Sequence, residues 1–177
     1  VSHQSDASTF GTAMITLQDS YGASNPDYID APFLANHDMA RYANTMTSDP
    51  VKIKYAAGLL MSMNGSPFVY YGDEIGLPSS GSKDENKRLP MLWSATTERG
   101  LTVGPPDADD GIESKFATVE EQLEDALSIL NYYKRAVRIR NENPEIARGV
   151  ITAYESLSDS NICVISKEYE GSTIYIV

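Results

Sequence analysis

Residues 31–76 read APFLANHDMARYANTMTSDPVKIKYAAGLLMSMNGSPFVYYGDEIG and contain two short apolar runs on either side of a helix-like stretch. The apolar runs cover 31–35 and 67–71, and each ends abruptly in polar residues or glycine, as buried strands do. Between them, 51–63 has helical periodicity, and Pro50 takes the first helical position, where its missing N–H would have no partner anyway. Strand, helix and strand in this order predict a β-α-β unit.

The spacing of apolar residues predicts further elements on both sides of this unit. The stretch from Leu77 to Thr118 is rich in Gly, Pro, Ser and Asp. Its length favours a functional loop, because structureless loops beyond about 12–15 residues are uncommon. The other predicted elements are a helix over 8–19, a helix over 119–143 and three strands over 150–154, 161–167 and 173–177.

Two domains are expected, over 1–146 and 147–177, because alternating strands replace the strand and helix pattern after Gly149. The second is an all-β unit whose last strand runs to Val177 without a turn or tail. The chain starts at Val1 without a methionine, and the polar residues that follow do not have the pattern of a signal peptide. We therefore expect further sequence on both sides of the chain.

The composition is that of a soluble globular protein, with 177 residues, 41% hydrophobic residues and a formal net charge of −11. Nucleic acids and anionic membranes attract basic proteins, so this charge argues against both as partners. No run approaches the roughly 20 apolar residues of a membrane-spanning helix. The single cysteine, Cys163, cannot form an internal disulfide and is expected to be a small buried residue on a strand.

Polar residues that follow the two predicted strands are the first candidates for a functional site. In parallel β/α folds the site lies beyond the carboxyl ends of the strands. The candidates are Asn36, His37, Asp38, Asp73 and Glu74. A structural alternative exists, because an adjacent His and Asp can also form a surface turn or cap the segment that follows.

Three segments, in this order, resemble segments of the alpha-amylase family of glycoside hydrolases. FLANHD at 33–38 is similar to the family's fourth signature segment, at the end of the seventh barrel strand. GSPFVYYGDEIG at 65–76 resembles the eighth strand with its exit loop, and KRLPMLW at 87–93 is similar to the next loop in oligosaccharide-acting members. The resemblance implies an α/β fold: the C-terminal portion of a TIM (β/α)8 barrel, about strands 7–8 and helices 6–8, followed by the beginning of an all-β sandwich domain.

The resemblance also implies roles for individual residues. Asp38 would be the catalytic third carboxylate, which binds hydroxyls of the sugar at the cleavage point and stabilises the positive charge of the transition state. His37 would bind a hydroxyl at the same place, and Asn36 and Arg41 are the other expected substrate-binding residues. For Arg41, an ion pair with a carboxylate and a solvated surface position are both left open.

A retaining glycosidase also needs a nucleophile and a general acid about 5–5.5 Å apart. In this family both lie upstream of the segment that the chain covers, and their motifs do not occur elsewhere in it. Asp73 and Glu74 are poor substitutes, because adjacent residues on an extended chain point in opposite directions, and we expect them to anchor loops. The isolated chain is therefore expected to be inactive.

The expected parent is a retaining alpha-amylase or alpha-glucosidase that hydrolyses alpha-glucosidic bonds in starch or malto-oligosaccharides. One alternative is a non-enzymatic relative whose barrel is a binding or interaction module, since a fold does not fix a function. Another is a transglycosylase or isomerase of alpha-glucosides. The intact Asn36-His37-Asp38 speaks against the non-enzymatic alternative, and an Asp and a Glu in the upstream motifs would decide between it and the enzyme.

The expected partner is an alpha-glucan or alpha-glucoside. Two strands leave a barrel open, so their edges need the remainder of the barrel, self-association or the chain's own C-terminal strands, and we expect self-association. Acidic composition is compatible with a bacterial enzyme outside the cell, so an extracellular or cell-surface location is favoured over a cytoplasmic one.

No cofactor or metal is expected in this chain, and calcium is left to the missing part of the parent. The acidic residues 107–111 resemble a calcium loop, but Thr118 stands where such a loop needs a bidentate Glu. Trp93 either stacks on a sugar ring or packs within its own loop.

Overall fold

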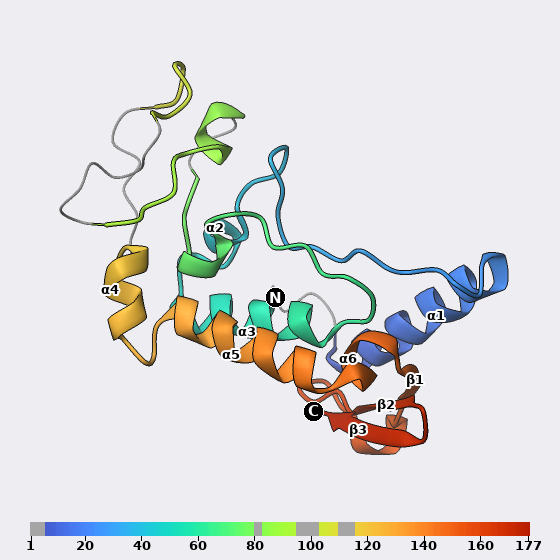
Figure 1. Ribbon diagram of the computed structural model, residues 1–177. Coiled ribbons are helices and arrows are strands. Elements are labelled where there is room, and N and C mark those ends of the chain that lie inside the picture. The colour runs from blue at the N-terminus through green and yellow to red at the C-terminus, as the bar shows by residue number, and fades with distance from the viewer. Residues whose placement is uncertain (1–5, 80–82, 95–102, 110–115) are drawn as a thin grey trace. The chain divides into compact units, whose positions relative to one another are not determined.

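The computed structural model describes residues 6–79, 83–94, 103–109 and 116–177. Their backbone forms two units, each assembled from separate stretches of sequence (Figure 1). The helical unit comprises the described residues of Phe33–Met61 and Phe68–Arg138, and the sheet unit comprises those of Val1–Pro32, Ser62–Pro67 and Ile139–Val177. All candidate site residues belong to the helical unit.

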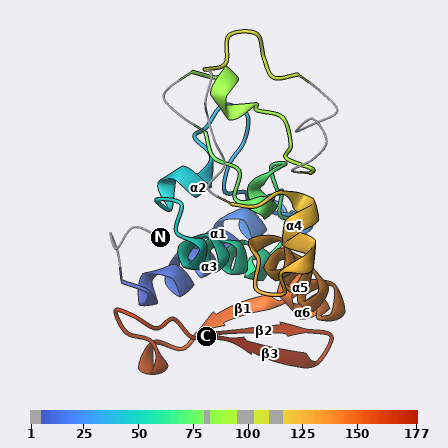
Figure 2. The same ribbon diagram turned by 90° about the vertical axis from the view of Figure 1, so that its left-hand side faces the viewer.

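The sheet unit contains three antiparallel strands in the order β1-β2-β3, which Figure 2 shows side by side. Glu170 and Gly171 both have positive φ in the two-residue turn between β2 and β3, as this kind of hairpin requires. Helix α1 packs on β1, and Met14, Ile151 and Ile165 form the buried cluster of this unit. The elements are α1 Ser8–Ser24, α6 Pro144–Arg148, β1 Val150–Ala153, η3 Glu155–Leu157, β2 Ile165–Tyr169 and β3 Ser172–Ile176.

The structure confirms the first helix and the three C-terminal strands of the sequence-based prediction, with shifted bounds. The second strand begins at Ile165 rather than at 161, because the Asp159 carboxylate accepts two backbone N–H groups and turns the chain there. Cys163 therefore lies just before β2, half-buried beside the apolar cluster, rather than on a strand. Helix α6 runs across the expected boundary between 146 and 147, and the division into two domains stays a prediction.

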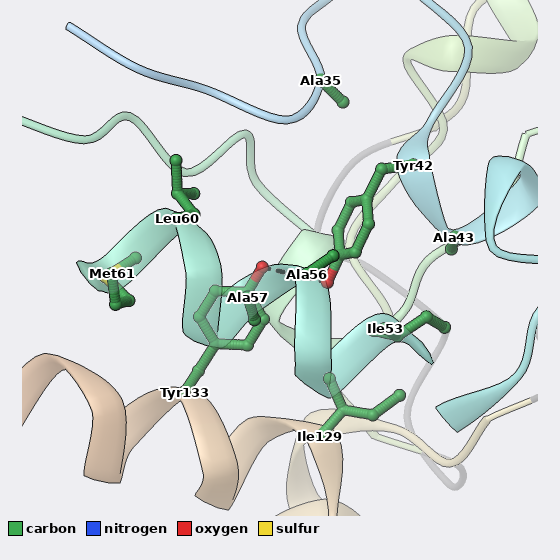
Figure 3. Packing of buried hydrophobic residues seen from close by; sticks show 10 residues of the cluster. All are labelled: Ala35, Tyr42, Ala43, Ile53, Ala56, Ala57, Leu60, Met61, Ile129 and Tyr133. Atoms are coloured by element: carbon green, nitrogen blue, oxygen red, sulfur yellow. Dashed lines mark hydrogen bonds between the residues drawn. The ribbon is translucent and has the colours of Figure 1, made fainter. Parts of the chain in front are cut away.

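The helical unit is built around α3 and α5, which lie side by side (Figure 1). Pro50 begins α3 as predicted, and the Asp49 carboxylate accepts the N–H of Val51. The core is drawn in Figure 3, where the hydroxyls of Tyr42 and Tyr133 share a hydrogen bond of 2.9 Å. No helix in the described ranges is long and apolar enough to span a membrane. The elements that lie wholly or mainly in this unit are α2 Tyr42–Thr45, α3 Pro50–Ser62, η1 Asp73–Ile75, η2 Glu85–Lys87, α4 Val119–Glu124 and α5 Ile129–Glu142.

The prediction of one continuous helix over 119–143 is wrong, because α4 ends at Glu124 and α5 begins at Ile129. The side chains of Asp125 and Ser128 each accept a backbone N–H from a residue that follows, at 2.8 and 3.0 Å. These bonds stop one helix and cap the next. Leu127, in the segment between the two helices, is exposed.

The two predicted strands of the β-α-β unit run parallel but pair at a single position within the described residues, Phe33 with Phe68. Two strands without further neighbours form a marginal sheet, so both runs are extended segments rather than full strands. Because the pairing is parallel, the residues that follow each run emerge at the same end of the helical unit. We call these two segments, 31–35 and 67–71, the extended runs.

Candidate active site

The turn after the first extended run presents His37 and Asp38 to solvent. Asn36 shapes this turn, because its Oδ1 accepts the backbone N–H groups of Asp38 at 2.9 Å and of Met39 at 3.1 Å. The Asp38 side chain is 65% exposed, and its Oδ2 lies 3.1 Å from Nε2 of His37. His37 and Asp38, two of the predicted site residues, therefore lie together on the surface. The side-chain oxygen of Asn36 is instead bonded within the turn.

Two cations at the end of η2 approach Asp38 from another part of the chain. Arg88 places Nη2 at 3.4 Å from Oδ1 of Asp38, and Lys87 donates from Nζ to the main-chain oxygen of Asp38 at 2.9 Å. Asp84 faces both cations, at 2.8 Å from Lys87 Nζ and 3.9 Å from Arg88 Nη2. The Lys87 hydrogen bond lowers the pKa of Asp84. The Asp38 carboxylate is thus flanked by an imidazole and a guanidinium.

Arg41 follows the same turn but is 0% exposed. Its guanidinium lies over the rings of Tyr70 and Tyr71, 4.5 and 4.7 Å from their centroids, and Nη1 donates to the Tyr71 carbonyl at 2.6 Å. The same nitrogen is 3.6 Å from Oδ1 of Asp73. Of the interpretations left open for Arg41, the ion pair is observed, and the solvated surface position is wrong because the side chain is fully covered.

The burial of Arg41 also conflicts with the expectation that this residue contacts substrate directly. A guanidinium without exposed surface offers no atom to a sugar, so in this structure Arg41 supports the site from within. It joins the turn at 36–41 to the segment after the second extended run. Ser79 strengthens the joint, since its hydroxyl accepts the N–H of Arg41 at 3.2 Å and its own N–H donates to Asn44 at 2.6 Å.

Asp73 is buried on the short helix η1 rather than on an extended chain. Burial raises the pKa of the Asp73 carboxyl to about 7, and the nearby Arg41 charge opposes that rise. Its main-chain oxygen accepts a hydrogen bond from the Tyr42 hydroxyl at 3.2 Å. This position fits the expected loop-anchoring role, and the Asp73 carboxylate is buried whereas that of Asp38 is exposed.

No group of three or more His, Cys, Asp or Glu side chains is placed to hold a metal ion in the described part of the chain. In the acidic segment, Asp109 accepts hydrogen bonds from Lys83 and Asn86. Asp110 and Gly111 of the same segment lie outside the described residues. Trp93 has an exposed side chain, and whether it stacks on a sugar ring or packs within its own loop stays a prediction.

The site can bind a hydroxylated ligand and stabilise positive charge on it, because a carboxylate and an imidazole face solvent side by side. The sequence-based prediction included Lys87 and Arg88 in the motif at 87–93 but did not predict that either residue contacts Asp38. One signal was present: Asp84, Lys87 and Arg88 stand three and four residues apart, which puts three charges on one side of a helical turn.

The sequence model for the alpha amylase catalytic domain matches residues 5–149 of this chain. Alpha-amylase SusG of Bacteroides thetaiotaomicron is 35% identical over 153 residues, which are 85% of this chain and 22% of SusG. Trehalose synthase/amylase TreS of Mycobacterium tuberculosis is 31% identical over 136 residues, 71% of this chain and 22% of TreS.

Among solved structures, Eubacterium rectale Amy13B has a TM-score of 0.89 and 40% identity to this chain. The match covers 96% of this chain and 33% of Amy13B. The alpha-amylase from H. orenii has a TM-score of 0.72 and 28% identity, over 94% of this chain and 37% of that protein. The chain thus spans between about a fifth and two fifths of the length of these relatives.

Proposed function

Because this chain belongs to the alpha-amylase family of catalytic domains, we propose that it supplies part of the active site of an enzyme that hydrolyses alpha-glucosidic bonds in starch or malto-oligosaccharides. The single observation that carries the proposal is the geometry of Asp38. Its carboxylate is 65% exposed, while the turn that carries it is fixed by Asn36. A carboxylate that is both exposed and held in place can stabilise charge without first reorganising.

Within a complete enzyme, we propose that the chain forms about strands 7–8 and helices 6–8 of the barrel, together with the beginning of a β domain. The parallel pairing of Phe33 with Phe68 on either side of α3 supports this assignment, because neighbouring barrel strands are parallel and joined through a helix. The three antiparallel strands after α6 support the β domain.

Asp38 would act on the sugar at the cleavage point, where positive charge develops in the transition state. His37, with its Nε2 3.1 Å from Asp38 Oδ2, would bind a hydroxyl of the same sugar. Asn36 and Arg41 would act indirectly, by shaping the turn and by joining it to the second extended run. The nucleophile and the general acid would come from sequence outside this chain, so the chain alone would be inactive.

A second candidate, transfer or isomerisation of alpha-glucosides, has a specific observation in its favour. Several relatives with 30–31% identity are trehalose synthases or trehalose synthase/amylases. The residues proposed here would serve either reaction, because both pass through the same kind of charged transition state. For residues of this chain we propose no cofactor, and we propose an extracellular or cell-surface location for the parent.

The proposal is tested by assaying the 177-residue chain and the complete polypeptide encoded with it on a chromogenic alpha-glucoside, soluble starch and maltose. Activity in the complete polypeptide alone, reduced at least about 100-fold by Asp38→Asn, is the expected result. Formation of trehalose from maltose would assign the second candidate instead of hydrolysis. Activity in the chain alone would overturn its inactivity, and silence of both proteins would overturn the enzymatic function.

A further inference from the structure

Two side chains, one from the same turn and one from a distant segment, hold the main chain of Asp38 on both sides of its Cα atom. Its N–H donates to Oδ1 of Asn36 at 2.9 Å, and its carbonyl oxygen accepts from Nζ of Lys87 at 2.9 Å. The first bond is local to the turn, but the second joins residues 49 positions apart. The direction in which the carboxylate projects therefore depends on a residue of η2.

Lys87 is unusually placed for a lysine, because it is only 9% exposed. Lysine carries a strongly hydrated charge and is rarely buried without a partner. Here the ammonium bonds to one carboxylate oxygen of Asp84 at 2.8 Å and to the neutral carbonyl of Asp38. Burial of a charge to hold a backbone carbonyl is costly, which favours a role in fixing the position of what it holds.

The main chain around Lys87 is itself fixed by the second extended run. The Tyr70 hydroxyl donates to the Lys87 carbonyl at 3.2 Å, and the Tyr71 hydroxyl donates to the Leu89 carbonyl at 2.9 Å. Lys87 thus connects the loop that is held by the second extended run to Asp38, which follows the first extended run. A displacement of either segment would move Asp38.

Resting on the proposed function, we propose that Lys87 is a positioning residue for catalysis, which sets the direction of the Asp38 carboxylate through its main-chain carbonyl. It differs from Arg88, whose guanidinium approaches the carboxylate oxygen itself at 3.4 Å. The hydrogen bond from Lys87 goes to the main-chain oxygen of Asp38, so it occupies neither of the carboxylate oxygens, which lie beside His37 and Arg88.

The test uses the complete polypeptide that contains this chain, with kcat and KM measured on a chromogenic alpha-glucoside. Lys87→Met should lower kcat about 10- to 100-fold with a smaller change in KM, because a misplaced carboxylate fails mainly in the transition state. Lys87→Arg, which keeps a cationic donor, should recover part of the loss. Lys52→Met removes an exposed lysine of α3 and is the matched control, with kcat unchanged.

A double-variant cycle separates positioning from general damage to the fold. If Lys87 acts through Asp38, Lys87→Met should have little further effect in an Asp38→Asn background. Additive losses, or a kcat of Lys87→Met equal to that of Lys52→Met, would overturn the positioning role. Should Lys87→Met fail to fold, Asp84→Ala removes the second hydrogen-bond partner of the ammonium. It should lower kcat in the wild-type background and leave kcat unchanged in the Asp38→Asn background. An inactive wild-type polypeptide would instead overturn the proposed function, and the positioning role with it.

Discussion

Arg41 and Asp73 form a buried ion pair in which solvation and attraction oppose each other. Both side chains are buried, and their closest charged atoms are 3.6 Å apart. Burial raises the pKa of Asp73 to about 7, whereas the Arg41 charge lowers it. Such a pair adds little net stability while intact, but loss of one partner leaves the other charge buried alone.

Arg41→Met should therefore destabilise the chain by about 3–5 kcal/mol at pH 8, where Asp73 is charged. The loss also includes the contacts of the guanidinium with the rings of Tyr70 and Tyr71. Urea unfolding measures the free energy of unfolding. Arg138→Met, at an exposed position on α5, is the control and should change it by about 0.5 kcal/mol or less. Equal effects of the two substitutions would contradict the structural role of Arg41.

Asp73 should also make stability depend on pH in a defined direction. The pKa of its carboxyl in the folded chain is about 7, against an ordinary value of 3.8. Between these values the folded state keeps a proton that the unfolded state releases, so the free energy of unfolding falls as pH rises, by at most about 1.4 kcal/mol per pH unit.

The Asp73→Asn variant lacks the pH-dependent contribution of the Asp73 carboxyl to the free energy of unfolding. Relative to wild type, the variant should become more stable as the pH rises from 4.5 to 7, with no further gain above about pH 8. Urea unfolding of both proteins at a series of pH values gives the difference. Parallel curves for the two proteins would show that Asp73 does not titrate in this range.

Local and distant contributions to the site differ in how far the sequence predicts them. The turn at 36–38 follows from adjacent residues, because the Asn36 side chain bonds to backbone groups two and three positions later. The contacts of Lys87 and Arg88 with Asp38 join residues 49 and 50 positions apart, so no local pattern reports them. The burial of Arg41 is likewise set by aromatic rings about thirty residues away.

At the scale of elements, apolar periodicity predicted α1, α3 and the C-terminal strands, and it failed where side chains bond to the backbone. The division between α4 and α5 depends on Asp125 and Ser128, which accept N–H groups that a continuous helix would use. The extended runs failed as strands for a different reason. A strand needs neighbouring strands to which its backbone can hydrogen-bond. The spacing of apolar residues within one segment does not show whether such neighbours are present.

Two glycines with nearly the same positive φ give a test at this scale. Gly65, after α3, has φ of 81°, and a Cβ atom there would lie 2.1 Å from the carbonyl oxygen of Asp30. Gly171, in the β2-β3 turn, has φ of 82° with nothing within 4 Å of such an atom. The two positions share the strain of the left-handed region and differ in the steric overlap with the backbone.

Gly171→Ala should therefore cost only about 1 kcal/mol, the left-handed strain of a non-glycine residue. Gly65→Ala should cost about 3 kcal/mol or more, because the main chain near Asp30 must also move. Thermal and urea unfolding of the two variants measure the difference. Similar losses for both would show that the chain around Gly65 can shift at little cost.

At the scale of the whole chain, the extended runs leave aromatic side chains on the surface of the helical unit. Phe33 is 48% exposed and Phe68 is 61% exposed. Their backbones pair at one position within the described residues, so polar groups along both runs can accept another strand. In a complete barrel these runs would be interior strands with both neighbours present.

We therefore predict that the isolated chain self-associates through the extended runs. Phe68→Lys should raise the dissociation constant at least about tenfold, because a charge on an exposed strand opposes the addition of another strand. Sedimentation velocity over a concentration series measures the equilibrium. Tyr55→Lys replaces an exposed aromatic residue on α3 and should leave the equilibrium unchanged. A wild-type chain that stays monomeric over the whole series would contradict the prediction, and an equal response to both substitutions would place the contact outside the extended runs.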